Sequence, residues 1–145
     1  MRARLSSDTL HASTVARDGR AVLITGRSGS GKSDLALRLV DRGFMLVSDD
    51  QTIVRRDGDQ LVATAPPTIS GKLEIRGIGI VEVPALSDVP VALIVDLSSE
   101  FARLPEDGRE RTILGVSVPL ITVDAMTASA AAKVALGLDH LGLKA

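Results

Sequence analysis

Cysteine is absent from the 145 residues of this chain, and aromatic side chains are nearly absent, with two Phe and neither Trp nor Tyr. The first absence excludes disulfides and thiolate metal sites, and it agrees with a reducing compartment. The second removes the ring surfaces on which many proteins stack single-stranded nucleic acid. With so few rings, the core must be built from aliphatic side chains.

The chain also lacks an excess of charge and a long apolar run. Its 17 basic and 18 acidic residues give a formal net charge of −1, so no overall field attracts nucleic acid or anionic lipid. The N-terminal segment is polar where a secretion signal needs an apolar stretch, and no apolar run approaches the ~20 residues that span a bilayer. We therefore expect a soluble, cytoplasmic protein that binds neither nucleic acid nor membrane.

The length and the apolar content of 45% suit one ordinary domain, and no repeat or low-complexity linker divides residues 1–145. We expect buried strands at 21–25, 44–48 and 91–97, a hairpin at the sheet edge within 51–64, and two short strands broken near Pro119 within 112–123. We expect helices at 33–41 and 127–141. Within 73–83, Gly77 and Gly79 indicate either a tight turn or a close backbone approach. Because strands outnumber helices, we predict a strand-rich α/β domain whose mixed sheet has a parallel centre and antiparallel additions.

The strongest motif follows the first of these strands and opens the first helix. It matches the P-loop pattern at every specified position, with the residues Gly26, Arg27, Ser28, Gly29, Ser30, Gly31, Lys32 and Ser33. Glycines let backbone N–H groups surround phosphates, and the helix N-terminus adds its positive end. Lys32 is the residue type that contacts the β and γ phosphates, and Ser33 is the type that binds magnesium. The alternative is a flexible Gly/Ser turn, which the flanking strand and helix disfavour.

Paired carboxylates, Asp49 and Asp50, close the second strand. The helix descends for about 16 Å and the following strand climbs back by about the same length, so both carboxylates return to the level of the phosphates. A P-loop enzyme needs a carboxylate there for magnesium or to take a proton from the attacking hydroxyl. Spacing alone leaves open a solvated acidic turn that leads into the hairpin.

Other charged side chains are ambiguous on their own. Glu74 and Arg76 interrupt an apolar stretch, where charges lie either on the solvent side of an edge strand or at a site. His11 is by default a surface histidine. Three arginines lie in or beside the polar loop at 98–110 and either close over a phosphate or remain in water: Arg103, Arg109 and Arg111.

Three segments taken together resemble the catalytic domain of the bacterial HPr kinase/phosphorylase family, whose members phosphorylate a serine of the phosphocarrier protein HPr. The most specific segment is LEIRGIGI at 73–80, which is close to the signature of that family. Beside it stand GRSGSGKSDLALRLVDRG at 26–43 and LVSDD at 46–50, at the separation that the family shows. The resemblance runs from about His11 to Val123 and implies a P-loop kinase-like fold of the HPr kinase/phosphoenolpyruvate carboxykinase type.

Carried over by position, the resemblance implies a role for each of several residues. Gly26 to Ser33 would bind ATP, with Lys32 catalytic and Ser33 on Mg²⁺. Asp50 would be the base in phosphorylation and the acid in the reverse reaction, and Glu74 a further Mg²⁺ ligand. His11 matches an active-site histidine, and Arg103 a catalytic arginine.

This sequence also departs from the family pattern. The usual N-terminal domain is not present in this sequence, which resembles a short form consisting of the catalytic domain. Ala12 follows the histidine where the family usually has glycine. Residues 124–128 replace a loop with Pro and Gly that is associated with removal of phosphate from phosphoserine-HPr, so the kinase reaction is expected more firmly than the phosphorylase reaction.

The leading hypothesis is thus an ATP- and Mg²⁺-dependent serine kinase acting on HPr, with a homo-oligomer among the expected states. Two alternatives remain open: a small-molecule kinase or phosphoenolpyruvate carboxykinase-like enzyme, and a nucleotide-sensing module with little turnover. The presence of Asp50, Glu74 and Arg103 favours catalysis, because a sensor has no need of a base.

Overall fold

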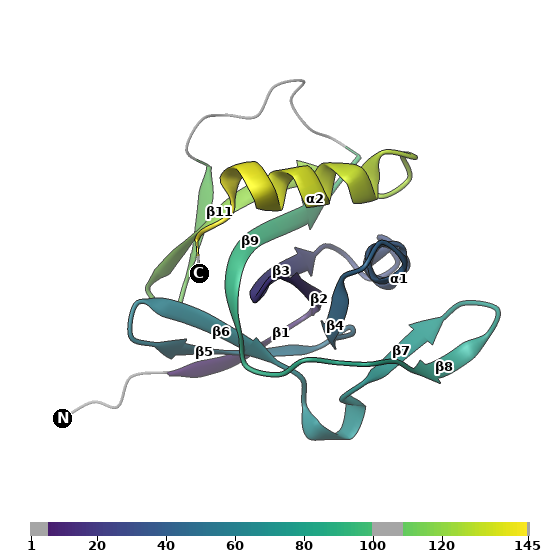
Figure 1. Ribbon diagram of the computed structural model, residues 1–145, viewed down its shortest axis with the longest axis horizontal. Coiled ribbons are helices and arrows are strands. Elements are labelled where there is room, and N and C mark those ends of the chain that lie inside the picture. The colour runs from purple at the N-terminus through teal and green to yellow at the C-terminus, as the bar shows by residue number, and fades with distance from the viewer. Residues whose placement is uncertain (1–5, 100–108, 145) are drawn as a thin grey trace.

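The computed structural model describes residues 6–99 and 109–144 as a curled sheet with helices on one face (Figure 1). The strands are β1 (Ser7–Leu10), β2 (Ala12–Arg17), β3 (Arg20–Thr25), β4 (Met45–Ser48), β5 (Thr52–Asp57), β6 (Gln60–Thr64), β7 (Lys72–Ile75), β8 (Gly79–Glu82), β9 (Val89–Leu97), β10 (Glu110–Ile113) and β11 (Val116–Val123). The helices are α1 (Lys32–Asp41), α2 (Ala130–Leu141) and the short 3₁₀ helix η1 (Pro67–Ile69).

The main sheet has a parallel centre, as the sequence predicts. Strand β9 lies parallel to β3 along one edge and parallel to β11 along the other, while the start of β9 pairs antiparallel with β6. The path through the sheet is β1-β5-β6-β9-β3-β2-β4, with β10 paired to β11. Because the carboxyl ends of β3, β9 and β11 point the same way, the loops that follow them meet at one edge of the sheet.

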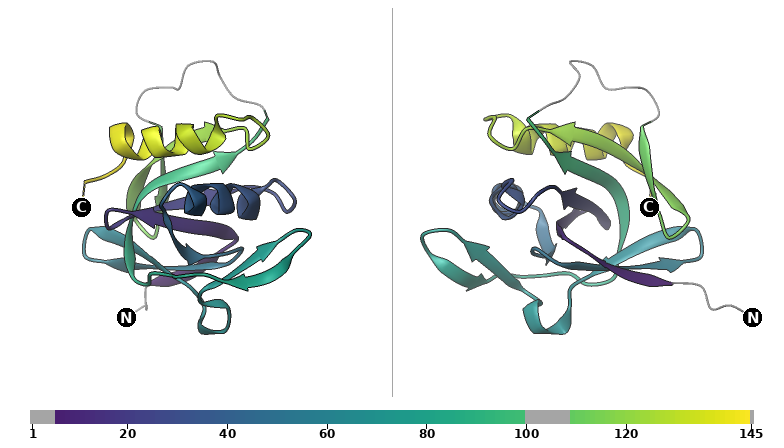
Figure 2. Two further views of the ribbon diagram at one scale, coloured as in Figure 1. Left: turned by 45° about the vertical axis from the view of Figure 1, so that its right-hand side comes forward. Right: turned by 180° about the vertical axis from the view of Figure 1, so that it is seen from behind.

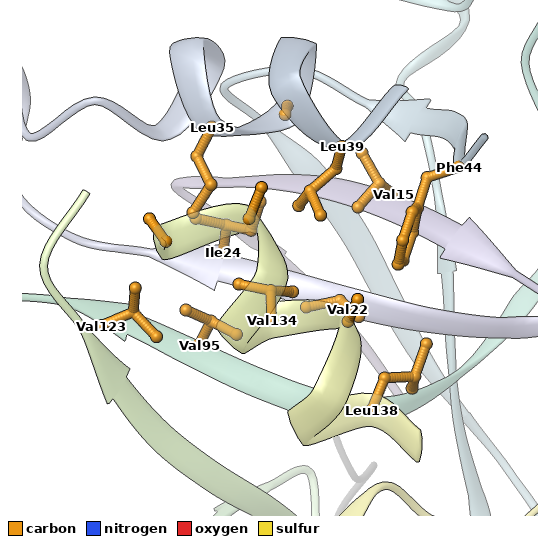
Figure 3. Close-up of a cluster of buried hydrophobic side chains, with 14 of the residues drawn as sticks. Val15, Val22, Ile24, Leu35, Leu39, Phe44, Val95, Val123, Val134 and Leu138 are labelled. Carbon is orange, nitrogen blue, oxygen red and sulfur yellow. The ribbon is translucent and has the colours of Figure 1, made fainter. Parts of the chain in front are cut away.

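Each face of the central strands is buried against a different layer. In β3, Val22 and Ile24 face α1 and α2, whereas Ala21 and Leu23 face the side of β5, β6 and β11. Figure 3 shows the helix-side cluster, in which Leu35 of α1 and Leu138 of α2 lie near the same strands. This two-sided burial explains why the run AVLIT is apolar without alternation.

Strands β1 and β2 were not predicted, because the segment before Arg20 is polar and two of its residues, Ser13 and Thr14, are fully buried. Strand β2 pairs antiparallel with both β3 and β4, so it separates two strands that are near neighbours in sequence. An Asp18-Gly19 turn with φ of 55° and 73° joins β2 to β3, which is the backbone form that tight hairpins need.

Two other predictions about strands were wrong. The hairpin of β5 and β6 is not at the edge of the sheet, because β1 pairs with the outer side of β5 and β9 pairs with the outer side of β6. The break in the last strand pair falls at Leu114-Gly115, where φ is 51° and 81°, and not at Pro119. Pro119 can lie within β11 because its nitrogen, which has no hydrogen to donate, faces a side where no partner is needed. The N–H of the next residue, Leu120, donates to Arg109 O, so the Pro119 nitrogen faces the opposite side, toward β9. There, pairing with β9 begins only at Leu120.

The hairpin of β7 and β8 forms a separate small sheet that extends away from the main body in several views (Figures 1 and 2). Leu73 at its base is fully buried in the helix-side core, while Ile78 and Ile80 near its tip are exposed. Gly77 and Gly79 adopt φ of 89° and 112°, and a Cβ added at either would meet nothing within 4 Å, so of the two alternatives the structure has the tight turn. Within the described residues, no helix is both long and apolar enough to cross a membrane.

Candidate functional site

The loop between β3 and α1 has the backbone form of a phosphate cradle. Gly31, the N-cap of α1, has φ of 99° and no side chain caps the helix. The first N–H groups of a helix have no carbonyl partners within it, so this end of α1 presents free donors and the positive end of the dipole. Gly26 lies so close to Ser30 that an added Cβ would sit 2.6 Å from the Ser30 hydroxyl oxygen. Glycine is therefore required at both ends of the loop.

The Lys32 side chain is buried beneath this loop. Its ammonium group donates to the carbonyl oxygens of Gly26 at 3.0 Å and of Arg27 at 2.9 Å. An ammonium group has three donors, so one remains for a ligand while two hold the loop in shape. The prediction that Lys32 serves phosphate thus agrees with its position.

Asp49 is the centre of the hydrogen-bond network and is 6% exposed. Its Oδ1 accepts from the hydroxyl groups of Ser33 at 2.6 Å and Ser13 at 2.9 Å, and its Oδ2 accepts from the backbone N–H of Glu74 at 3.1 Å. A buried carboxylate is costly unless hydrogen bonds compensate its charge, and these donors provide that compensation. Asp49 therefore joins the phosphate loop, strand β2 and the hairpin of β7 and β8.

Asp50 points to a different partner. Its Oδ1 lies 2.8 Å from His11 Nε2, and its backbone N–H donates to Ser13 Oγ at 3.0 Å. Asp50 has φ of 66°, a left-handed conformation that is uncommon outside glycine. Both side chains of the pair are about half exposed, at 49% for His11 and 61% for Asp50, so the contact contributes little to stability and chiefly sets the direction of the carboxylate.

Buried hydroxyl groups hydrogen-bond the turn that contains both aspartates to β2. Thr52 donates to the Ala12 carbonyl at 2.9 Å and lies 2.8 Å from the hydroxyl of Thr14. The Ser48 hydroxyl also bonds the Gln51 carbonyl across the turn. Such a polar network rigidifies a site when its members are satisfied.

Glu74 lies on β7 with its backbone bound to Asp49 and its side chain exposed. Within residues 6–99 and 109–144, no three His, Cys, Asp or Glu side chains gather as a metal-binding cage. Mg²⁺ is commonly held by one or two carboxylates together with substrate phosphates. The Ser33 hydroxyl, the Asp49 carboxylate that it bonds and the exposed carboxylate of Glu74 are oxygen ligands of this kind, so the chemistry of these residues fits the ion.

Sequence reasoning missed a second polar cluster at the start of the loop. Thr25, the last residue of β3, donates to Asp96 Oδ1 at 3.0 Å, and Arg111 Nη1 lies 3.4 Å from the Thr25 hydroxyl. The signal was present, since Asp96 is an acid at the carboxyl end of a buried strand. The Arg109 guanidinium instead donates to Thr122 Oγ1 at 3.1 Å.

The structure thus brings together residues that the sequence could only nominate. Asp49 bonds Ser33 of the loop and the backbone of Glu74, Lys32 bonds the loop carbonyls, and His11 contacts Asp50, the residue after Asp49. Ser13 was missed altogether, because one serine in a polar segment carries no distinguishing pattern. Arg103 lies outside the described residues.

A glycine-rich loop that links a buried strand to a helix N-terminus, with a carboxylate bonded to its last serine, defines a domain of the P-loop class. A family model described as the HPr Serine kinase C-terminal domain matches residues 3–135. The chain belongs to this family.

Individual relatives agree with the family model. An HPr kinase/phosphorylase of Limosilactobacillus reuteri is 43% identical over 133 residues, which cover 82% of this chain. One of Chlorobium luteolum is 42% identical over 125 residues, or 77% of this chain. The aligned regions cover 41% and 38% of these relatives, so the chain spans well under half of their length.

A solved structure extends the likeness to the fold. The HPr(Ser) kinase/phosphatase from Coxiella burnetii matches with a TM-score of 0.78 and 32% sequence identity. The match covers 92% of this chain and 95% of the other. The predicted fold, a strand-rich mixed α/β sheet of the HPr kinase type, is therefore confirmed.

Proposed function

We propose that this chain is an ATP-dependent serine kinase whose substrate is the phosphocarrier protein HPr. The observation that carries the proposal is the joining of Ser33, Asp49 and Asp50 with His11 beside an uncapped helix N-terminus, in a chain of the HPr kinase family. A nucleotide-sensing module would need the loop but not the exposed Asp50 carboxylate.

Each residue has a distinct role in the proposed reaction. Residues Gly26 to Ser33 hold the triphosphate through backbone N–H groups, and Lys32 stabilises negative charge on the transferring phosphoryl group. Asp50 accepts the proton of the serine hydroxyl as the serine oxygen bonds to the γ-phosphorus and ADP leaves. His11 fixes the direction of the Asp50 carboxylate through their 2.8 Å contact.

Magnesium completes the proposed site. Mg²⁺, when bound, neutralises charge on the β- and γ-phosphate oxygens. Ser33 and Glu74 are the proposed ligands, and Asp49 holds the Ser33 hydroxyl toward the loop. Arg103, which resembles a catalytic arginine of the family, is proposed to stabilise the same charge. We further propose that the protein acts in the cytoplasm and that several copies assemble.

The test is incubation of the purified chain with labelled ATP, Mg²⁺ and HPr from the same genome, followed by mapping of the modified residue. We expect one phosphoserine on HPr. The matched control is Asp50→Asn, because asparagine also tolerates the left-handed backbone at this position. ATP binding without transfer to HPr, or undiminished transfer by Asp50→Asn, would contradict the proposal.

A further inference from the structure

Residues 124–129 lie at the edge of the sheet that carries the phosphate loop, and the proposed phosphoryl transfer gives them no role. They follow β11, which is parallel to β9 and through it to β3, so they emerge on the same side as the phosphate loop. Figures 1 and 2 show this turn and the start of α1 on the same side of the molecule. The segment contains neither glycine nor arginine, the residues that best bind phosphate.

This segment is in contact with the phosphate loop. A Cβ added to Gly31 would lie 3.3 Å from the Cβ of Ala125. The Arg38 guanidinium on α1 donates to the carbonyl oxygens of Ala125 at 2.5 Å and Thr127 at 3.4 Å, and its Nε lies 3.2 Å from Asp34. Because two nitrogens of the Arg38 guanidinium bond these carbonyls, the guanidinium holds the segment against α1 instead of facing a phosphate.

Internal hydrogen bonds also shape the segment. Asp124 Oδ1 accepts from the Met126 backbone N–H at 2.9 Å, and the Asp124 carbonyl accepts from the Thr127 hydroxyl at 2.8 Å. The turn is therefore built without a ligand. At its tip the Met126 side chain is 89% exposed, the most exposed of the large hydrophobic side chains described.

The two ends of the phosphate site differ. Asp49 and the Asp50–His11 pair lie at the Ser33 side, where the serine that receives the phosphate must approach. The γ-phosphate therefore belongs at that side, and the nucleoside must extend away from it. Ala125 marks the Gly31 side, which places residues 124–129 where the nucleoside leaves the loop.

A nucleobase needs an apolar surface, and the candidates can be compared. Phe44, the single described phenylalanine, is 2% exposed and belongs to the core. Ile78 and Ile80 lie on the hairpin that Glu74 joins to Asp49, at the opposite end of the site. Leu136 is on the outer side of α2. Of the side chains compared, Met126 is the exposed one that directly follows Ala125, the neighbour of Gly31, and its polarisable sulfur makes favourable contacts with aromatic rings.

We propose that residues 124–129 form the nucleobase platform of the ATP site, with Met126 packing against the base. The inference rests on the proposed function only in taking ATP as the ligand of the phosphate loop. It assigns to this segment the selection of ATP over phosphate chains that have no base.

The experiment compares binding of ATP and of inorganic tripolyphosphate, both with Mg²⁺, by calorimetry on the wild type, Met126→Ala and Met126→Leu. We expect Met126→Ala to weaken the binding of ATP roughly 2- to 10-fold and to leave the binding of tripolyphosphate unchanged, because only ATP carries a base. Met126→Leu keeps most of the apolar surface, so its affinity for ATP should lie between that of the wild type and that of Met126→Ala. Leu136→Ala, which removes an exposed apolar side chain of α2, is the matched control and should change the affinity for neither ligand.

Three results would overturn the platform: unchanged ATP binding by Met126→Ala, equal weakening of both ligands, or wild-type binding of ATP no tighter than that of tripolyphosphate. Failure of the kinase proposal is recognised separately. A chain that binds ATP through Met126 but transfers nothing to HPr would refute the proposed substrate and support the platform.

Discussion

At the scale of single residues, the hydroxyl group of Ser13 connects the two aspartates of the site. It donates to Asp49 Oδ1 and accepts from the Asp50 backbone N–H, and the residue is fully buried. The left-handed backbone of Asp50 is thereby held by a side chain on a neighbouring strand.

Ser13→Ala should therefore destabilise the domain and slow phosphoryl transfer. A buried group left without its partner costs about 1–3 kcal/mol, and this change affects both Asp49 and Asp50. Urea denaturation and the HPr assay measure the two effects. Thr112→Ala is the control, because it removes an exposed hydroxyl that is also hydrogen-bonded, to Ser117. Equal stability of the two variants would show that the Ser13 bridge is unimportant.

Lys32 allows a second prediction at this scale. Lys32→Met keeps the apolar stem under the loop but removes the charge, so we expect a folded protein whose transfer rate is roughly 10²–10³-fold lower. Circular dichroism checks the fold and the HPr assay checks the rate on one preparation. Normal turnover in the folded variant would remove the phosphate loop from the mechanism.

At the scale of elements, the hairpin of β7 and β8 contributes to the site in two separable ways. The Glu74 backbone binds Asp49, whereas its exposed side chain is the proposed Mg²⁺ ligand. Glu74→Gln keeps the backbone bond, so unfolding free energy should change by less than about 0.5 kcal/mol. The Mg²⁺ concentration for half-maximal activity should rise by about tenfold. A magnesium titration with an unchanged midpoint would return Glu74 to the role of an edge-strand charge.

Residues 124–129, between β11 and α2, contain no glycine or arginine to bind inorganic phosphate, and we predict that the reverse reaction is therefore slow. Phosphorolysis of phosphoserine-HPr needs inorganic phosphate held in line, and Asp124 would repel that anion. Loss of one hydrogen bond to a charged group, about 1.5 kcal/mol, predicts a reverse rate more than about tenfold below the forward rate. Release of dephosphorylated HPr at millimolar phosphate measures it. Comparable rates in both directions would show that this segment is dispensable for phosphate.

At the scale of the whole molecule, the central strands are shared by two hydrophobic clusters, one under the helices and one under β5, β6 and β11. A shared sheet should make the chain unfold as the single domain predicted from its length. Leu35→Ala and Leu61→Ala, one in each cluster, should each cost about 2–5 kcal/mol and lower one common transition. Calorimetry would contradict this if the two variants split the unfolding into separate steps.

The sequence alone determined the phosphate loop, because the strand, the glycines, Lys32 and Ser33 are consecutive and their chemistry is local. It also placed Asp49 and Asp50 near that loop, since one helix and one strand return the chain to the same edge, and the 2.6 Å contact of Ser33 with Asp49 agrees. At Gly77 and Gly79 the sequence left a tight turn and a close backbone approach open, and the structure has the turn.

Only the tertiary structure determined the orientation of the Asp49 and Asp50 carboxylates. Strand β2 inserts between β3 and β4, which brings His11 to Asp50 across 39 positions and Ser13 to Asp49 across 36. A polar segment gives no apolar pattern from which to predict a central strand. Its burial is stable because Ser13 and Thr14 find hydrogen-bond partners in the turn after β4, and those partners exist only once the sheet has formed.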